Sequence, residues 1–445
     1  MAEVVEVLSG VDEVRAAARA WIEENWDPDV TIKQWLERLA DSGWAKPTWA
    51  RGSFGLGLTN DEAAAAGEEF RTTGAPGPPG GLSMLAAPTI VAHGTEEQKQ
   101  RFVRAILTGE ETWCQLFSEP GAGSDLASLQ TRAMRDGEEW IVNGQKVWTS
   151  GGQFADLGML IARTNPDAPK HKGISWFAFE MRQPGVEVRP LRQMTGGAAF
   201  CEVFFTDARV PHENLVGGEN EGWGAALTTL ANERVNLGAG GAGGFATTAP
   251  AGRQQAEALQ ERVGSFVERG RSRRAEGRAR GGGGRGGRGG GGGRGGRGDA
   301  MVGLAKSLGR NNDPVIRQQV AQLYTLQSVN RWNGMRAKAA VASGQRPGPE
   351  NSLGKLMTSH IVRASRDVGM AIVQAGGMLS GPDAPVNGGI TSQFLSSPAP
   401  SIYGGSDQVQ RNIIGERVLG LPKEPDPFAD LPFRELKVGT QRREE

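Results

Sequence analysis

Two short stretches, Phe117-Ser-Glu-Pro-Gly-Ala-Gly-Ser-Asp125 and Asn143-Gly-Gln-Lys-Val-Trp-Thr-Ser150, contain the clearest structural signals in the 445-residue sequence. In the first, Gly121 and Gly123 free the backbone of side-chain bulk, so its polar groups can approach a ligand closely. In the second, the dipeptide Asn143-Gly144 suits the positive backbone angles of a tight hairpin. The residues on either side of this dipeptide are strand-like, so we expect it to connect two strands.

The sequence around these stretches predicts a β domain. From Trp113 to about Asp207 the chain is rich in β-branched and aromatic residues, and Gly, Pro and Asp separate its apolar runs. The expected strands include Trp140–Val142, Val147–Thr149, Ile174–Phe179, Val186–Val188 and Phe200–Phe205. Four or more such strands predict a small sheet or a barrel-like domain.

Helices are predicted on both sides of this domain, because apolar residues recur there at spacings of three and four. The expected helices are 11–26, 31–42, 61–71, one that begins with a capping box at Thr95 and Gln98, 223–237, 313–342, 352–375 and 406–418. The order of helices, strands and helices argues against an alternating nucleotide-binding fold. The glycine run 238–244 follows a helix, whereas a dinucleotide-binding loop follows a strand.

Length and composition indicate a globular protein of two or three packed subdomains. The two cysteines, Cys114 and Cys201, have no disulfide or metal-ligand spacing, and the four histidines have none either, so we expect no metal. The first residues are acidic where a signal peptide needs positive charge, and no apolar run is long enough to span a membrane. These features favour a cytoplasmic protein.

A Gly/Arg-rich stretch interrupts the C-terminal helical region at about residues 270–299. Between Arg269 and Gly298 there are ten arginines and one acidic residue, Glu276, so the rest of this neutral chain has an excess of acidic residues. With few apolar residues to bury, the stretch is predicted to be a disordered insertion. RNA binding is the alternative, but no aromatic residues lie among these arginines and no RRM, KH or OB-fold motif accompanies them.

Four motifs, in order along the chain, resemble those of the acyl-CoA dehydrogenase family. They are His93-Gly-Thr-Glu-Glu-Gln-Lys99, the two stretches quoted above, and Ile402-Tyr-Gly-Gly-Ser-Asp-Gln-Val-Gln-Arg-Asn-Ile-Ile414. The resemblance implies an α+β protein with an N-terminal α-helical domain (1–112), a middle β-barrel-like domain (113–221) and a C-terminal four-helix bundle (222–445). The order of helices and strands read from periodicity agrees with this architecture.

The resemblance also implies an enzyme that oxidises an acyl-CoA thioester to its 2,3-enoyl form with FAD as the cofactor. FAD is expected between the middle and C-terminal domains, with an electron-transfer flavoprotein or a similar protein as the electron acceptor. A homo- or hetero-oligomer, built as a dimer of dimers, is expected to complete the ADP end of the FAD site. A bulky acyl group, branched, long or steroid-like, is the preferred substrate class.

By the same resemblance, the glycine-containing loop and the strand after it contact the cofactor and the substrate. Ser124 is expected to bind the substrate. The expected flavin contacts in this region are Phe117, Ser118, Gly123, Trp148, Thr149 and Ser150. Without the resemblance, the same residues would be interpreted as a glycine turn and a tryptophan in the core of a sheet.

The position of the catalytic base distinguishes this chain from many family members. Those members have a carboxylate directly after the tyrosine of the last motif, but here that residue is Gly404. A second arrangement in the family places the base on the first long helix of the C-terminal domain, before an arginine, and Glu233 and Arg234 match it. We therefore expect Glu233 to abstract the substrate proton, and Arg234 and the Gly404 N–H to bind the substrate. A solvated acid on the helix surface is the alternative interpretation of Glu233.

Two residues of the last motif, Ser406 and Gln408, match family positions near the flavin and its ADP portion. A helix cap and a surface amide are equally ordinary explanations for them. The missing acid at Gly404 also leaves a second hypothesis open. In that hypothesis the chain is a non-catalytic partner subunit of a heteromeric acyl-CoA dehydrogenase.

Overall fold

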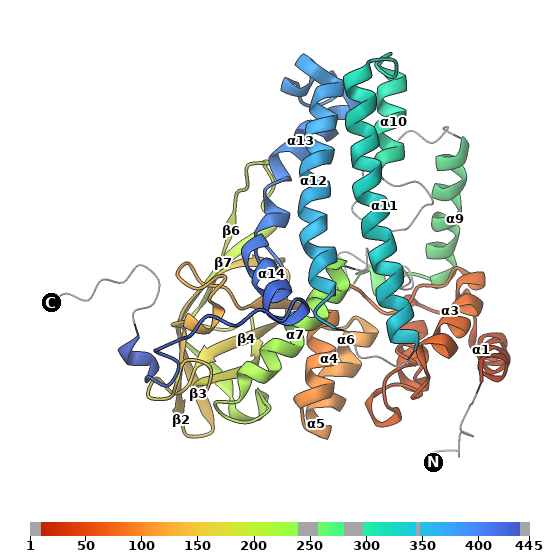
Figure 1. Ribbon diagram of the computed structural model, residues 1–445. Helices are drawn as coiled ribbons and strands as arrows, with labels where there is room; N and C mark the ends of the chain where they lie inside the picture. Colours follow the sequence, from red (N-terminus) through yellow and green to blue (C-terminus); the bar gives the residue numbers. More distant parts are fainter. Residues whose placement is uncertain (1–9, 239–256, 280–296, 344–347, 437–445) are drawn as a thin grey trace.

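In the computed structural model, N-terminal helices, a mixed β-sheet and long C-terminal helices follow one another along the chain (Figure 1). The structure describes residues 10–238, 257–279, 297–343 and 348–436. The long helices α11 (Pro314–Ala342) and α12 (Asn351–Val373) run side by side above the N-terminal helices in this view. Among the described residues, no helix is both long enough and apolar enough to cross a membrane.

The N-terminal region consists of short helices around an aromatic cluster in which Trp21 contacts Trp35 and Phe70, with ring centroids 5.6 and 5.8 Å apart. Its helices are α1 (Val11–Asn25), α2 (Ile32–Ser42), α3 (Asn60–Thr73), α4 (Ser83–His93), α5 (Glu96–Gln98) and α6 (Arg104–Thr108), with a 3-10 turn at Arg51–Ser53 and a π-helical turn at Lys99–Val103. The predicted capping box is confirmed. Thr95 Oγ1 accepts a hydrogen bond from the Gln98 N–H, and the Gln98 side chain accepts one from the Thr95 N–H.

The middle region is one eight-stranded sheet in the order β6-β7-β3-β2-β4-β5-β8, with β1 paired in parallel to β4. Its strands are β1 (Trp113–Leu116), β2 (Arg132–Asp136), β3 (Glu139–Ser150), β4 (Leu157–Arg163), β5 (Ile174–Glu180), β6 (Val186–Leu191), β7 (Phe200–Pro211) and β8 (Leu215–Val216). The strands predicted from Ile174, Val186 and Phe200 onward are confirmed as β5, β6 and β7. Every residue of β4 is buried, so the centre of the sheet is covered on both faces.

The hairpin predicted at Asn143-Gly144 is wrong, because β3 continues through this dipeptide. The pairing of β3 with β7 shifts register between Val142 and Gly144, which makes a β-bulge, and Gly144 has a φ of 149°. A Cβ at Gly144 would lie 2.5 Å from Thr131 Oγ1, so the glycine permits a close approach of two backbones. The tight connection lies earlier, at Gly137 between β2 and β3, where φ is 63°.

The C-terminal region is helical, as predicted. Its helices are α7 (Gly222–Gly238), α9 (Val263–Ala279), α10 (Arg297–Ser307), α11, α12, α13 (Gly389–Ser396) and α14 (Asp407–Ile413), which a π-helical turn at Ile414–Val418 extends. Of the predicted disordered insertion, residues 280–296 lie outside the described residues, as does nearly all of the glycine run 238–244. The described parts of the insertion are helical instead: residues 270–279 continue α9, and Arg297 begins α10. Buried Val263 and Val267 anchor the start of α9, and arginine is a good helix former, so the helix extends beyond its packed turns.

Helix α7 connects the sheet with both groups of helices, since it packs against α4, β5 and α12. Ala225 and Ala226 of α7 share one apolar core with the N-terminal helices and with Trp176 of β5. The C-terminal segment returns to the sheet, where Phe433 covers the guanidinium of the buried Arg163 at 3.7 Å from the ring centroid. Figure 1 shows this end of the chain beside the sheet. Helix α7, which carries Glu233, therefore packs against both the sheet and the C-terminal helix α12.

Candidate active site

A buried ion pair fixes the loop between β1 and β2. Lys146, in the bulged part of β3, is fully buried, and its ammonium donates to Glu119 Oε1 at 2.8 Å and to the Phe117 carbonyl at 3.0 Å. The Glu119 carboxylate also accepts hydrogen bonds from the backbone N–H groups of Gln130 and Thr131. Although burial opposes the charged form, the Lys146 ammonium and these donors hold the pKa of Glu119 below its ordinary value. One carboxylate thus ties both ends of the loop together.

The outer side of this loop presents glycines and a hydroxyl to the surface. Glu119 and Ala122 exchange backbone hydrogen bonds of 3.0 and 3.1 Å, which close a tight turn. Apart from adjacent residues, no described atom lies within 4 Å of the place where a Cβ would stand at Gly121 or Gly123. Ser124 is exposed. The backbone of the loop is therefore open to a flat ligand from outside.

Trp148 of β3 has two features that are unusual for a strand residue. Its φ is 62°, in the left-handed region, and it is 60% exposed. It lies at a second irregularity in the pairing of β3 with β7, between Lys146 and Thr149, and its ring is nearly perpendicular to that of Phe200. Backbone strain in a non-glycine residue and an exposed indole are both typical of ligand-binding surfaces.

The start of the glycine-containing loop lies against the same part of β3. Phe117 is buried, and the carbonyl of the half-buried Ser118 accepts a hydrogen bond from the Val147 N–H at 2.9 Å. Thr149 is buried, and no described group hydrogen-bonds to its Oγ1. Ser150, half-buried, ends the strand. An uncovered backbone, an exposed indole and a buried hydroxyl without a partner fit a bound flavin.

Glu233 lies on the inward face of α7. At helical spacing it continues the buried stripe of Ala226 and Thr229, and it is itself half-buried. Thr229 and Thr89 of α4 share a hydrogen bond of 2.8 Å, which holds this face of α7 in place. The Glu233 carboxylate accepts a hydrogen bond of 3.4 Å from the side-chain amide of Gln115 in β1. Because β1 leads directly into the glycine-containing loop, Glu233 faces the start of that loop.

Gly404 lies in a loop that α12 holds by polar contacts. Lys355 donates to the Pro400 carbonyl at 2.6 Å, and Arg363 donates to the buried Asp407 at 3.1 Å. Gly404 has a φ of 64°, a left-handed conformation that most other residues adopt only with strain. Glycine is therefore the residue that this turn favours at position 404.

The remaining predicted residues lie on α14 and α7. Ser406 is the N-cap of α14, and its hydroxyl accepts a hydrogen bond from the Val409 N–H. Gln408 is exposed. Arg234 follows Glu233 in α7, but its side chain is outside the described ones. Since α12 packs against both α7 and α14, it is the element that connects the Gly404 loop with Glu233.

Sequence reasoning assigned no role to two residues of this region, Gln115 and Lys146. Lys146 belongs to the quoted motif, and its position in an apolar strand was the available signal, because a buried lysine needs an acidic partner. Gln115 stands in a short apolar run at alternate spacing from Trp113 and Phe117. A polar residue at such a position indicates a specific partner inside the protein.

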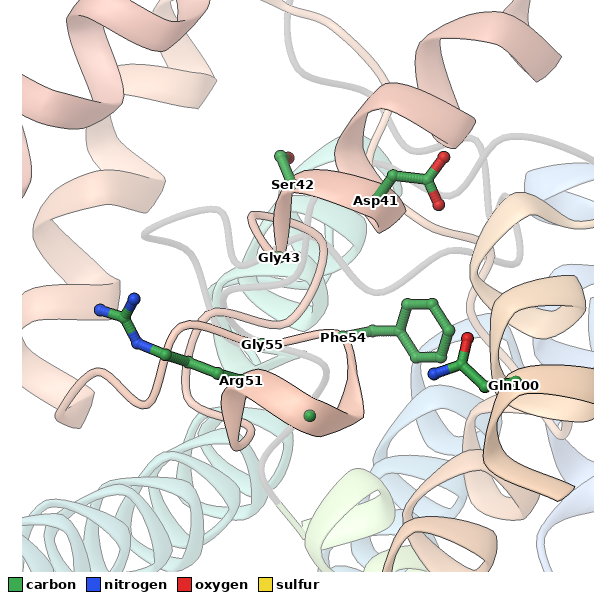
Figure 2. Close-up of a pocket in the computed structure, with 8 residues that line it drawn as sticks. Asp41, Ser42, Gly43, Arg51, Phe54, Gly55 and Gln100 are labelled. Carbon is green, nitrogen blue, oxygen red and sulfur yellow. The ribbon is translucent and has the colours of Figure 1, made fainter. Parts of the chain in front are cut away.

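A separate hollow of about 230 Å³ lies among the N-terminal helices (Figure 2). It is lined by Asp41, Ser42, Gly43, Arg51, Gly52, Phe54, Gly55 and Gln100, and the Phe54 ring is directed toward Gln100. Asp41 is paired with Arg104 of α6 through two hydrogen bonds of 2.8 Å. None of the predicted site residues lines this hollow. In the part of the chain that the structure describes, no three His, Cys, Asp or Glu side chains gather as a metal site would require.

Comparisons with known proteins assign the chain to a family. Models of the acyl-CoA dehydrogenase N-terminal, middle and C-terminal domains match residues 10–110, 114–208 and 301–419. Acyl-CoA dehydrogenase IpdE1 of Mycobacterium tuberculosis is 32% identical over 441 residues, which cover 94% of this chain and 99% of that protein. Acyl-CoA dehydrogenase FadE34 of the same organism is 36% identical over 386 residues, or 86% of this chain, but the chain spans only 46% of FadE34.

A solved structure shows the same architecture. The Tcur3481-Tcur3483 steroid ACAD is 25% identical with a TM-score of 0.63, and the match covers 94% of this chain and 100% of that one. The match therefore extends over the N-terminal helical region, the β-sheet and the C-terminal helical region. Because all three domain models match and IpdE1 aligns over nearly its whole length, the chain belongs to the acyl-CoA dehydrogenase family, whose members are flavoprotein oxidoreductases that act on acyl-CoA thioesters.

Proposed function

We propose that the chain is an FAD-dependent acyl-CoA dehydrogenase that forms a 2,3-enoyl-CoA with Glu233 as its base. The observation that carries this proposal is the inward placement of Glu233 on α7, with its carboxylate 3.4 Å from the Gln115 amide of β1. The alternative position for a base, directly after Tyr403, is Gly404, which has no side chain to accept a proton. A solvated surface acid would face away from β1, so the packing of Glu233 favours the catalytic role.

The reaction requires a carboxylate on the face of the substrate opposite the flavin. Glu233 removes the proton from Cα of the acyl group, and exclusion of water by the bound substrate raises its basicity. The Gly404 N–H donates to the thioester carbonyl as negative charge develops on the oxygen. Ser124 and Arg234 bind the substrate. When bound, the flavin supplies the acceptor for the hydride that leaves Cβ.

We place FAD over the open side of the glycine-containing loop. The exposed, strained Trp148 and the buried Thr149 Oγ1 without a partner support this position. The proposed cofactor contacts are Phe117, Ser118, Gly123, Trp148, Thr149, Ser150, Ser406 and Gln408. Ser406 caps α14 and Gln408 lies in its first turn, so they would contact the flavin from the helical side.

A bulky acyl-CoA is the proposed substrate class. A base on the helix resembles the arrangement of family members that act on branched, long or steroid-like acyl groups, and one similar solved structure is a steroid ACAD. That protein is named for two components, which supports a homo- or hetero-oligomer for this chain as well. The proposed electron acceptor is an electron-transfer flavoprotein or a similar protein.

The proposal is tested by mixing flavin-loaded protein anaerobically with a panel of acyl-CoAs while following flavin absorbance. Wild-type protein should bleach with at least one bulky acyl-CoA, whereas Glu233→Gln should keep its flavin and bleach about 100-fold more slowly or worse. Glu219→Gln, at an exposed position just before α7, is the matched control and should react like wild type. Near-normal bleaching of Glu233→Gln would assign the base elsewhere. A colourless wild-type protein would support the non-catalytic partner subunit.

A further inference from the structure

Gln115 is a polar side chain on a face of β1 that is otherwise apolar. Side chains alternate between the two faces of a strand, so Gln115 shares its face with Trp113 and with Phe117 just beyond the strand. Both aromatic residues are 3% exposed and belong to the same apolar core. Cys114 and Leu116, on the opposite face, are fully buried. An amide between two buried aromatic side chains is costly unless it is hydrogen-bonded.

Glu233 provides a hydrogen-bond partner for this amide. Gln115 Nε2 donates to Glu233 Oε2 at 3.4 Å, across the contact between β1 and α7, and both residues are half-buried. One helical turn before Glu233, Thr229 is fixed to Thr89 of α4 by the 2.8 Å hydrogen bond between their hydroxyls. Because α4 also packs against β1, it holds both of the elements that carry Gln115 and Glu233.

An amide suits a partner that changes its protonation state. Its N–H donates to a carboxylate, and after rotation of the amide its carbonyl accepts from the O–H of a carboxylic acid. A lysine at the same place would stabilise only the charged form, and it would lower the basicity of the carboxylate. The pairing of Glu119 with Lys146 is an example of that second arrangement in the same region.

We propose that Gln115 is a positioning residue for the reaction, whose amide orients the Glu233 carboxylate toward the substrate and holds the carboxylic acid after proton abstraction. The inference rests on the proposed role of Glu233 as the base. In each turnover the proton moves from Cα of the acyl group to Glu233. Gln115 keeps its own protons throughout, so it contributes to the geometry of the base, and it stabilises the carboxylate more than the carboxylic acid because a hydrogen bond to a charged acceptor is stronger.

The pH profile of kcat/KM tests this role in flavin-loaded wild type, Gln115→Met and Gln115→Glu. A donor to a carboxylate lowers its pKa, so loss of the donor in Gln115→Met should move the acid limb up by about one pH unit. The carboxylate in Gln115→Glu should move the limb further, because a like charge disfavours ionisation of Glu233. Gln100→Met, at an exposed position of the N-terminal region, should leave the limb in place.

The outcomes separate this inference from the proposed function. If Glu233→Gln turns over at nearly the wild-type rate, the base is wrong and the role of Gln115 fails with it. If Glu233→Gln is inactive but neither Gln115 variant moves the limb, the base stands and the positioning role is wrong. Should Gln115→Met lose its flavin, Gln115→Glu, which is nearly isosteric with the native residue, gives the deciding profile.

Discussion

Glu119 and Glu233 are two glutamates next to the same loop, and each accepts a hydrogen bond from a different kind of side chain. Glu119, in the inner layer of the loop, is 8% exposed and accepts from the Lys146 ammonium and from two backbone N–H groups. Glu233, on the helix that faces β1, is half-buried and meets the neutral amide of Gln115. The ion pair of Glu119 with Lys146 is thus a charged anchor of the loop, whereas Glu233 accepts a hydrogen bond from the neutral amide of Gln115.

The two glutamates show how one residue type can serve as a structural anchor and as a proposed catalytic base. A cation beside a carboxylate stabilises its charge, which suits an anchor that must never change state. A base takes up a proton in each turnover, so a neutral donor orients it with a smaller effect on its pKa. The Lys146 ammonium therefore marks Glu119 as a structural anchor, whereas the Gln115 amide is one hydrogen-bond donor to the proposed catalytic Glu233.

Breaking the anchor should have the largest effect on stability. Lys146→Met leaves the Glu119 charge buried without its cation, which typically costs about 3–5 kcal/mol. The double variant Glu119→Gln, Lys146→Met removes both charges and should regain part of this loss. Urea denaturation followed by tryptophan fluorescence measures both, with the exposed Lys172→Met as the control. Equal stability of Lys146→Met and wild type would mean that the loop has another anchor.

Two tryptophans of β3 allow a second comparison, between a side chain in the core and one on the proposed flavin-binding surface. Trp140 is 1% exposed, so Trp140→Ala should cost about 3–5 kcal/mol. Trp148 is strained and mostly exposed, so Trp148→Ala should change stability by less than about 1 kcal/mol but weaken flavin binding. Urea denaturation of the flavin-free proteins and flavin titration give the two quantities. A Trp148→Ala protein that binds flavin normally would contradict the proposed position of FAD.

The smallest effect concerns the pH dependence of the anchor. The folded-state pKa of Glu119 lies below its unfolded value, about 4.3 for a free glutamate. Its contribution to stability is therefore complete above the unfolded value and is lost as pH falls through the folded one. The difference in unfolding free energy between wild type and Glu119→Gln should shrink as the pH is lowered from neutral toward 3. A difference that stays constant over this range would contradict an ionised anchor.

The arrangement of helices and strands was largely predictable because it depends on local periodicity. The long helices α11 and α12 and the strands β5 to β7 all stand where the apolar spacing indicated. The Asn143-Gly144 hairpin failed because pairing with β7 and the close approach to Thr131 outweigh the local turn preference of that dipeptide. Helix α13 begins at a glycine and has eight residues, so it offered little periodic signal.

The site was predictable only as far as its motifs extend. The motifs predict Glu233 and the glycine-containing loop as parts of the site, but the contact of Glu233 with Gln115 joins residues 118 positions apart. That contact depends on how α7 packs against the sheet, which no local pattern encodes. The Lys146 and Glu119 pair likewise needs the bulge in β3 that was interpreted as a hairpin. Contacts between residues of different helices and strands therefore could not be predicted without three-dimensional coordinates.

Proton abstraction by Glu233 is measured most directly when hydride transfer is impossible. An acyl-CoA without hydrogen at Cβ, such as tert-butylacetyl-CoA, can exchange its Cα protons with deuterium oxide but cannot reduce the flavin. Flavin-loaded wild type and Glu219→Gln should incorporate deuterium at Cα, as followed by mass spectrometry, and Glu233→Gln should incorporate it about 100-fold more slowly. Exchange by Glu233→Gln at the wild-type rate would contradict the account.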